Sequence, residues 1–216
     1  MKRVVVLASG SGSNLQALIG AVQSGELQAT IAGVISDRPG AGALQRAVQA
    51  GIPAVTVPLH DRRDAAARAE FEHRLADEIA ALRPDLVVLA GWMLILGDPV
   101  LGHYRGRVIN VHPALLPDGP EAEVESSQGP VPALRGAHAV RDALRRGMPL
   151  TGATVHIVTP AVDTGPVLLR EEVPILAGDD QERLHNRIKL VEHQLLPRAV
   201  ALALESQAAE ENSWRA

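Results

Sequence analysis

Short, uninterrupted apolar runs alternate with amphipathic segments over the first half of this chain, and this alternation limits its fold more than any other feature. Strands buried on both faces of a parallel sheet have such continuous apolar patterns, which occur at residues 4–8, 31–36, 54–57, 86–89 and 108–111. Helical patterns separate these runs at residues 15–22, 41–50 and 64–82. Strand–helix alternation of this kind requires right-handed crossovers. The sequence therefore predicts an α/β fold with a single doubly wound, mainly parallel sheet flanked by helices.

The second half of the chain has a different pattern. Residues 154–158 and 167–173 are apolar runs separated only by a turn-like stretch, which predicts a C-terminal β-hairpin. Two aspartates then offer helix caps before a last helix over residues 181–204. Residues 205–216 are polar, and we expect a fraying tail there. Residues 1–204 are accordingly expected to form one domain.

One segment, residues 118–132, interrupts this regular organisation. It contains Gly, Pro, Glu and Ser, and its few apolar residues show no periodicity. The composition predicts an inserted flexible loop. Two interpretations remain open: a solvated insertion without a role, and a lid over an active site. The second is suggested by the polar motif that directly precedes the segment.

Composition excludes several classes of function. A net charge of −4 argues against a protein that holds nucleic acid, which requires a basic face. The absence of cysteine excludes disulfides and thiolate chemistry and is compatible with the cytoplasm. No apolar run has the length that spans a membrane, and the one near the N-terminus is too short for a signal peptide. We therefore expect a cytoplasmic protein with small-molecule partners and with neither nucleic acid nor membrane as partner.

Two short motifs carry side chains suited to proton transfer, Asn110-Val111-His112-Pro113 and Asp163-Thr164-Gly165-Pro166. Asn110 and His112 share one face at the end of a predicted strand, where α/β sheets collect ligands. An imidazole transfers protons near neutral pH, an amide stabilises an oxyanion, and a carboxylate can hold the imidazole charged. The motif contains no Ser or Cys nucleophile, which indicates direct group transfer. The alternatives are a core histidine and an ordinary turn aspartate.

A glycine-rich segment, Ser9-Gly10-Ser11-Gly12-Ser13-Asn14, lies between the first predicted strand and helix. Phosphate binding and a tight, capped turn are both compatible with it. It is not the dinucleotide fingerprint, because Leu15 stands where that motif has its last glycine, and it lacks the Lys of a nucleoside triphosphate loop. The remaining histidines, including His156, which could face either side of its strand, lack zinc-type spacing. No metal is expected.

Four motifs taken together resemble the phosphoribosylglycinamide formyltransferase family, the folate-dependent formyltransferases of purine biosynthesis. They occupy residues 12–15, 89–93, 110–117 and 162–166, in order and at compatible spacing, within a resemblance that runs from residue 3 to 200. Residues 110–117 alone are shared with methionyl-tRNA formyltransferase and formyltetrahydrofolate deformylase. The Gly-Ser-Asn loop and the overall length favour the purine enzymes.

The resemblance implies that 10-formyltetrahydrofolate, as co-substrate, gives its formyl group to the amino group of phosphoribosylglycinamide. It implies that Asn110 and a protonated His112 bind the oxyanion, and that Asp163 raises the pKa of His112. The implied contacts to phosphoribosylglycinamide are Gly12, Ser13 and Asn14 for its phosphate, Glu192 for its ribose, and His138. The implied folate contacts are Arg68, Met93, Leu94, Ile95, Leu96, Asn110, Thr159, Pro160, Ala161 and Val162.

The chain departs from the family pattern at two places. Leu94 replaces an arginine of some members. The family's aromatic-Pro-Gly sequence corresponds to Arg135-Gly136-Ala137-His138, delayed by roughly fifteen residues, an insertion that folding tolerates because loop closure entropy grows slowly.

Three alternatives to the formyltransferase remain. The first is a formyl-folate hydrolase or another formyltransferase, and the second a non-catalytic phosphate-ligand-binding module. The third is a nicotinamide-dependent oxidoreductase that uses Asp37. A monomer and a homodimer are both compatible with the sequence.

Overall fold

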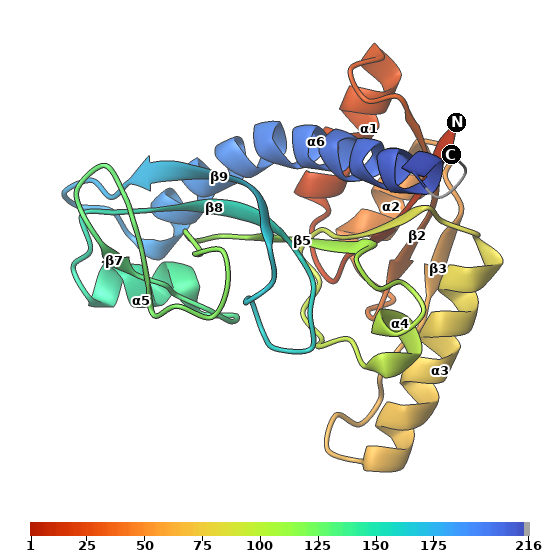
Figure 1. The fold of residues 1–216 in the computed structure, drawn as a ribbon. Helices are drawn as coiled ribbons and strands as arrows, with labels where there is room; N and C mark the ends of the chain where they lie inside the picture. The colour runs from red at the N-terminus through yellow and green to blue at the C-terminus, as the bar shows by residue number, and fades with distance from the viewer. Residues whose placement is uncertain (214–216) are drawn as a thin grey trace.

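The structure, a computed structural model, describes residues 1–213 and is built around one seven-stranded sheet with the order β3-β2-β1-β4-β5-β8-β9 (Figure 1). The strands of this sheet are β1 (Lys2–Leu7), β2 (Ala29–Ser36), β3 (Ala54–Thr56), β4 (Leu86–Leu89), β5 (Val108–His112), β8 (Leu150–Ile157) and β9 (Val167–Pro174). A separate pair consists of β6 (Glu123–Val124) and β7 (Val131–Pro132). The helices are α1 (Ser13–Ser24), α2 (Gly42–Gln49), α3 (Ala65–Ala81), α4 (Asp98–Leu101), α5 (Ala139–Arg145) and α6 (Gln181–Ser213).

The sheet is parallel from β3 to β5 and antiparallel from β5 to β9, which confirms the predicted fold class and the C-terminal hairpin. Strand β5 therefore has a parallel neighbour on one side and an antiparallel neighbour on the other. Its carboxyl end, at His112, lies where the polarity of the sheet changes. In open α/β sheets, ligands bind outside the carboxyl ends of strands where the strand order reverses, and here that point lies between β1 and β4, next to β5.

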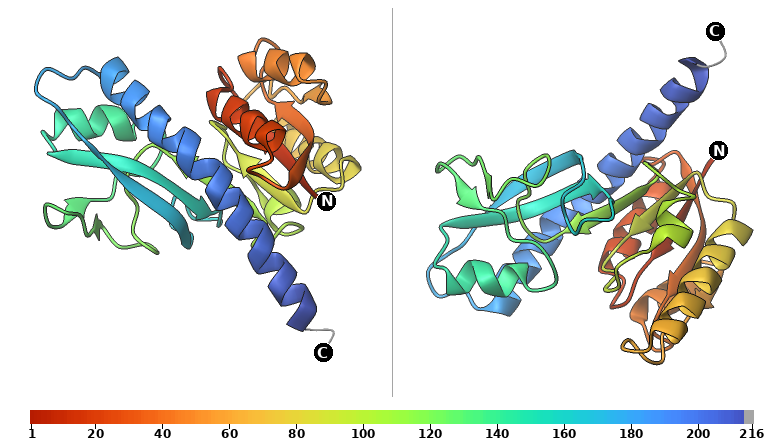
Figure 2. Two further views of the ribbon diagram at one scale, coloured as in Figure 1. Left: turned by 90° about the horizontal axis from the view of Figure 1, so that it is seen from above. Right: turned by 60° about the horizontal axis from the view of Figure 1, so that its bottom comes forward.

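Two apolar layers cover the sheet and explain the uninterrupted apolar runs. Val4 and Val6 of β1 belong to the cluster that contains residues of α1, α2 and α6, whereas Val5 and Leu7 belong to the cluster under α3 and α4. Residues 4–7 of β1 are therefore buried on both faces of the sheet, which explains why this part of the strand is uninterruptedly apolar. Helix α6 runs along the length of the sheet, from the β8–β9 hairpin to the N-terminal half (Figure 2).

Several elements differ from the sequence predictions. Helices α4 and α5 and the pair β6–β7 were not predicted, because elements of two to seven residues are too short to show periodicity. The segment predicted as a loop, residues 118–132, contains this β6–β7 pair. Helix α6 continues past residue 204 to Ser213, where a polar tail was expected; residues 214–216 of that tail lie outside the described part of the chain.

Candidate active site

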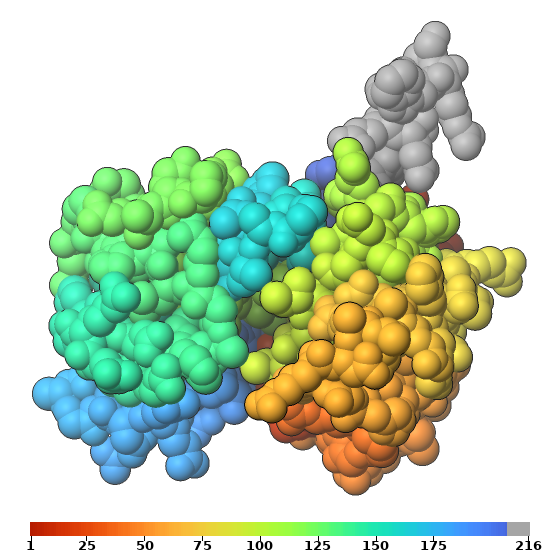
Figure 3. Space-filling model, turned by 90° about the horizontal axis from the view of Figure 1, so that it is seen from below, coloured from red at the N-terminus to blue at the C-terminus, as the bar shows by residue number. Residues whose placement is uncertain are grey.

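A cavity of about 740 Å³ opens at the carboxyl ends of β1, β4 and β5, a size typical of small-molecule sites. Figure 3 shows the surface hollowed between the half that carries β8 and β9 and the half that carries α3. The structure brings most of the predicted site residues to its wall. They are Gly12, Ser13, Asn14, Met93, Leu94, Ile95, Leu96, Asn110, His112, His138, Thr159, Pro160, Val162, Asp163 and Glu192.

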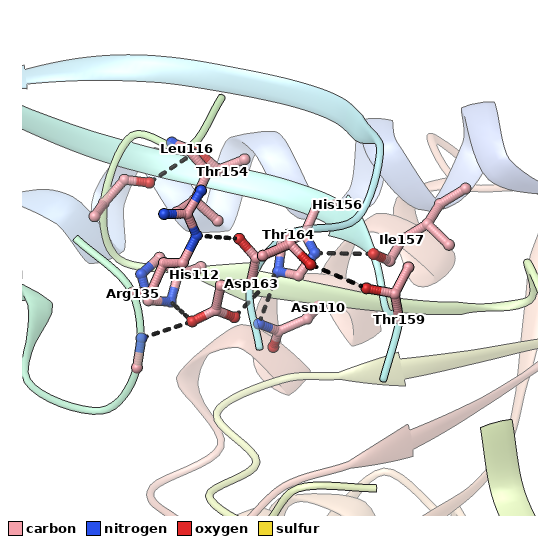
Figure 4. A network of polar contacts seen from close by, with 12 residues as sticks. Asn110, His112, Leu116, Arg135, Thr154, His156, Ile157, Thr159, Asp163 and Thr164 are labelled. Carbon is pink, nitrogen blue, oxygen red and sulfur yellow. Dashed lines mark hydrogen bonds and ion pairs between the residues drawn. The ribbon is translucent and has the colours of Figure 1, made fainter. Parts of the chain in front are cut away.

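Asn110 and His112 lie at the carboxyl end of β5 and face the cavity together, as their alternation predicts. Asp163 reaches them from the loop between β8 and β9, where the sequence alone offered no means of placing it (Figure 4). One of its carboxylate oxygens lies 3.5 Å from His112 Nδ1. The three residues predicted to act in catalysis thus form one cluster.

His112 is buried, and both of its ring nitrogens face acceptors. Its Nε2 lies 2.7 Å from the carbonyl oxygen of Leu134, and its Nδ1 faces Asp163. Burial lowers the pKa of His112, while Asp163 and the Leu134 carbonyl raise it, and the effect of burial is the larger one. The contribution of Asp163 to the His112 pKa is thus upward, while the net displacement, dominated by burial, is downward.

Asp163 remains ionised in spite of its partial burial. Burial raises the pKa of Asp163, but the adjacent His156, the charge of His112 and the hydrogen bond from the backbone N–H of Gly136 lower it to about 2. The Gly136 N–H donates to the carboxylate at 2.7 Å. The backbone of Asp163 has a φ of 52°, a left-handed conformation that is uncommon among residues other than glycine, asparagine and aspartate.

His156 is a site residue that the sequence analysis did not select. In the antiparallel register it lies opposite Asn110, so the two side chains share a face of the sheet. Its Nδ1 hydrogen-bonds the Ile157 carbonyl at 3.0 Å, and its Nε2 lies 3.2 Å from the Asn110 amide and 3.5 Å from Asp163 (Figure 4). Alternation along β8 offered two faces, and only the pairing with β5 decides between them.

The glycine-rich loop enters the cavity because α1 starts from a left-handed glycine. Gly12 has a φ of 76°, and a Cβ there would lie 2.6 Å from the Cα of Ala43. Next to it, the Asn14 amide donates a 2.8 Å hydrogen bond to the Glu192 carboxylate of α6. Burial raises the pKa of Glu192, although Asn14 and Lys189 lower it. Two residues predicted to contact the same substrate, 178 positions apart, thus meet directly.

Three cations on this cavity wall were also missed by the sequence analysis: Arg38, Arg141 and Lys189. Lys189 lies on α6, one turn before Glu192. Residues three positions apart on a helix share a face, so this spacing would have indicated Lys189 once α6 was known to pack beside α1. His138, at the start of α5, lines the same wall. The wall of this cavity therefore combines cations with a helix N-terminus, a combination that favours an anion.

Residues 93–96 form the opposite wall, with alternating exposure. Met93 and Ile95 are 49% and 61% exposed, whereas Leu94 and Leu96 belong to the core cluster under α3. An apolar side chain at position 94 is therefore compatible with this fold, although some family members carry arginine. The Ser9 hydroxyl accepts a 3.0 Å hydrogen bond from the Met93 N–H and holds the segment in place.

Within residues 1–213, two of the predicted folate contacts do not line the cavity. Arg68 donates to Glu72 at 2.6 Å and to the carbonyl of Ile95, so it supports residues 93–96 from behind. The carbonyl of Ala161 accepts hydrogen bonds from Thr159 and Thr164 inside the turn. In the same part of the chain, no three His, Asp or Glu side chains are arranged to hold a metal ion.

Comparison with known proteins agrees with this geometry. The chain belongs to the formyl transferase family, whose model matches residues 2–200. Within that family it is similar to phosphoribosylglycinamide formyltransferases. The Mycobacterium tuberculosis protein of that name is 44% identical over 201 residues, which cover 92% of this chain and 83% of the relative. The crystal structure of glycinamide ribonucleotide transformylase 1 from Symbiobacterium toebii superposes with a TM-score of 0.83 at 39% identity, covering 95% of this chain and 89% of that one.

A longer relative contains a similar region. The trifunctional purine biosynthetic protein adenosine-3 of Drosophila melanogaster is 41% identical over 209 residues, 96% of this chain. The chain spans only 14% of the length of that relative.

Proposed function

We propose that this protein transfers the formyl group of 10-formyltetrahydrofolate to the amino group of phosphoribosylglycinamide, a step of purine biosynthesis. One observation carries the proposal: a single cavity joins the cation-lined glycine-rich loop to the cluster of Asn110, His112 and Asp163. A phosphorylated amine bound at the loop extends toward the groups that handle protons and oxyanions. The family and the names of its similar members support the same reaction.

In this proposal His112 acts as the base for the attacking amine. Burial lowers the pKa of His112, which favours the neutral ring that a base requires, and its Nδ1 accepts the proton that the amine loses as its nitrogen bonds to the formyl carbon. The imidazolium formed then has the Leu134 carbonyl on one side and the Asp163 carboxylate on the other. When the bond from the formyl carbon to the folate nitrogen breaks, the His112 imidazolium gives its proton to that nitrogen, so that tetrahydrofolate leaves and His112 is neutral again.

Asn110 stabilises the oxygen of the tetrahedral intermediate. An amide carries two N–H groups, and His156 faces the Asn110 amide nitrogen at 3.2 Å, which leaves a second N–H for the oxyanion. Loss of one such donor typically lowers the rate by about 10²–10³-fold. Because the donor is uncharged, it does not compete with His112 for the proton.

The acceptor substrate is recognised by its phosphate and ribose. Gly12, Ser13 and Asn14 offer backbone N–H groups at the start of α1, and Lys189 adds a positive charge. Glu192, held by Asn14, presents a carboxylate suited to ribose hydroxyls. His138 lines the same part of the wall.

The folate occupies the space between residues 93–96 and the turn of residues 159–162. The exposed apolar side chains of Met93 and Ile95, together with half-exposed Val162, suit a flat heterocycle. Backbone groups of both segments supply hydrogen-bonding partners for the polar edges of the heterocycle. The identity of the side chain at position 94 therefore matters little for folate binding. Arg68 acts here through its support of Ile95.

Within the described residues, no helix has the combination of length and apolarity that crossing a membrane requires. We assign the protein to the cytoplasm, with small molecules as its partners and a monomer or a homodimer as its assembly.

The test is formyl transfer from a 10-formyl-folate analogue, followed by absorbance with and without phosphoribosylglycinamide. We expect turnover only when the ribonucleotide is present, a loss of at least 10²-fold in kcat for His112→Ala, and no change for His73→Ala, an exposed histidine on α3. Formate release without the ribonucleotide would instead identify a hydrolase. Tight binding without turnover would identify a binding module.

A further inference from the structure

The inserted segment, residues 118–132, is attached to the β8–β9 hairpin at its start and near its tip. The Asp118 carboxylate accepts a 3.0 Å hydrogen bond from the backbone N–H of Val167. Near the tip, the Ser127 N–H donates to the Glu172 carboxylate at 2.7 Å, and the Ser127 hydroxyl donates to the same carboxylate. Both anchor points lie on β9, at its beginning and toward its end. A lid that opens would have to break them all.

The inserted segment also buries apolar side chains of its own. Val124 and Val131, which face each other across β6 and β7, are 3% and 4% exposed. They pack in one cluster with Leu115, which follows β5, and with Met148, which precedes β8. This packing adds to the hydrogen bonds and makes the segment part of the folded body.

Arg135 joins the inserted segment to the loop that carries Asp163. Its Nε donates to the backbone carbonyl of Asp163 at 3.0 Å, and its Nη2 donates to the carbonyls of Gly119 and Glu121 at 3.1 and 2.8 Å (Figure 4 shows the first). A single guanidinium thus serves three carbonyls of two different segments. The ammonium group of a lysine cannot reproduce this planar fork. The next residue, Gly136, holds the Asp163 carboxylate itself.

We propose that the inserted segment is a fixed brace for the Asp163 loop, and that Arg135 is the positioning residue through which it acts. The backbone of Asp163 has a positive φ, which is uncommon for a residue other than glycine, and Arg135 donates a hydrogen bond to the carbonyl of that same residue. The segment thereby fixes the carboxylate between His112 and His156. The expected effect on kcat rests on the proposed formyl transfer. The coupling between residues 118–132 and the loop that carries Asp163 does not depend on it.

Two substitutions at Arg135 separate its shape from its charge. Arg135→Met removes both, and Arg135→Lys keeps only the charge. We expect each to lower kcat by about 10–100-fold, since a displacement of 1 Å at a reacting group has effects of this size. The KM for phosphoribosylglycinamide should stay within twofold, because the phosphate and ribose contacts lie on α1 and α6. Arg145→Met, an exposed arginine on α5, is the control and should leave kcat unchanged.

Hydrogen–deuterium exchange of the full chain without substrates supplies a readout that does not depend on activity. We expect slow exchange of residues 118–132 in the unaltered protein, and faster exchange of both residues 118–124 and residues 159–166 in Arg135→Met. Ser127→Ala, at the exposed tip, should loosen the same brace with a smaller loss of kcat. Combined with Arg135→Met it should add little, because the link is already broken.

Three results would overturn the proposal. The first is an Arg135→Lys variant with unaltered kcat, which would reduce the role of Arg135 to its charge. The second is faster exchange confined to residues 118–124 in Arg135→Met. The third is fast exchange of residues 118–132 in the unaltered protein, the behaviour of a lid. If the unaltered protein shows no formyl transfer, the proposed function fails, and the exchange experiments still decide on the brace.

Discussion

Two opposing influences set the proton affinity of His112. Burial disfavours the charged ring, and the adjacent carboxylate and carbonyl favour it. The balance suits a group that is neutral before the reaction and receives a proton during it, since the acceptors are already in place when the charge forms. Asp163, with its pKa of about 2, stays ionised across the pH range in which such an enzyme works.

The effect of Asp163 on His112 is open to direct measurement. A negative charge stabilises the imidazolium and raises the pKa of His112, so Asp163→Asn should lower that pKa further. The value is followed by NMR titration of the His112 ring protons, with Asp77→Asn, an exposed aspartate on α3, as the control. A higher pKa in Asp163→Asn would contradict the assigned balance. The same variant should lose at least 10²-fold in kcat, because the imidazolium loses its partner.

Part of this site could be predicted from local sequence and part could not. Asn110 and His112 are two residues apart in one strand, so alternation was sufficient to place them on one face. Asp163 was linked to them only through the family resemblance. His156 and Arg135 were not selected because their partners come from strand pairing and from an insertion. Neither leaves a periodic signal in a single sequence.

At the scale of elements, the geometry of the glycine-rich loop depends on one residue. Gly12 has a positive φ, and a Cβ at this position would lie 2.6 Å from the Cα of Ala43, so any side chain displaces α1 from α2. The loop and the start of α1 move together, because the Gly12 carbonyl accepts the first hydrogen bond of the helix, from Gln16.

Two glycines of the same region make a matched pair for testing this dependence. Gly12→Ala should destabilise the protein by about 1–3 kcal/mol and raise the KM for phosphoribosylglycinamide, because a strained conformation and a steric conflict coincide. Gly20→Ala should instead stabilise it by about 0.5–1 kcal/mol, since Gly20 lies exposed inside α1 with open space around its Cα. Urea unfolding of both variants checks the signs. Equal effects would refute the argument.

The parallel strands were predictable because each is buried on both faces and therefore uninterrupted in its apolar sequence. The residues at which helices and strands begin and end were harder to predict from the sequence. Strand β8 begins at Leu150, earlier than residue 154, in a stretch that includes Thr151 and Gly152. A polar residue and a glycine in a strand hide its start from any pattern of hydrophobicity. The glycine is required there, because a Cβ would lie 2.3 Å from the Glu171 carbonyl.

At the scale of the whole molecule, α6 joins the β8–β9 end of the sheet to α1. It contributes Leu184 and Ile188 to the same apolar cluster that contains Leu15 and Leu18 of α1 and Val173 of β9. Helix α6 supplies Gln181, His185, Lys189 and Glu192 to the cavity wall, so the shape of the cavity depends on how this helix docks.

Two leucines of α6 test this role. Leu195 is 2% exposed and Leu190 is 65% exposed. Leu195→Ala should lower the free energy of unfolding by about 2–5 kcal/mol, as burial and cavity formation predict. Leu190→Ala should change it by less than about 0.5 kcal/mol. Denaturant titrations with an unchanged m-value make the comparison valid, and similar losses in both variants would contradict the packing.

The hydrogen bond between Asn14 and Glu192 has a consequence for folding during synthesis. Synthesis proceeds from the N-terminus, so the glycine-rich loop leaves the ribosome long before its partner on α6 has been translated. Until α6 has been translated, the apolar side of α1 lacks the cover of Leu184 and Ile188, and the cavity lacks the wall that α6 supplies. A ligand that needs both the glycine-rich loop and α6 therefore cannot stabilise the chain at that early stage.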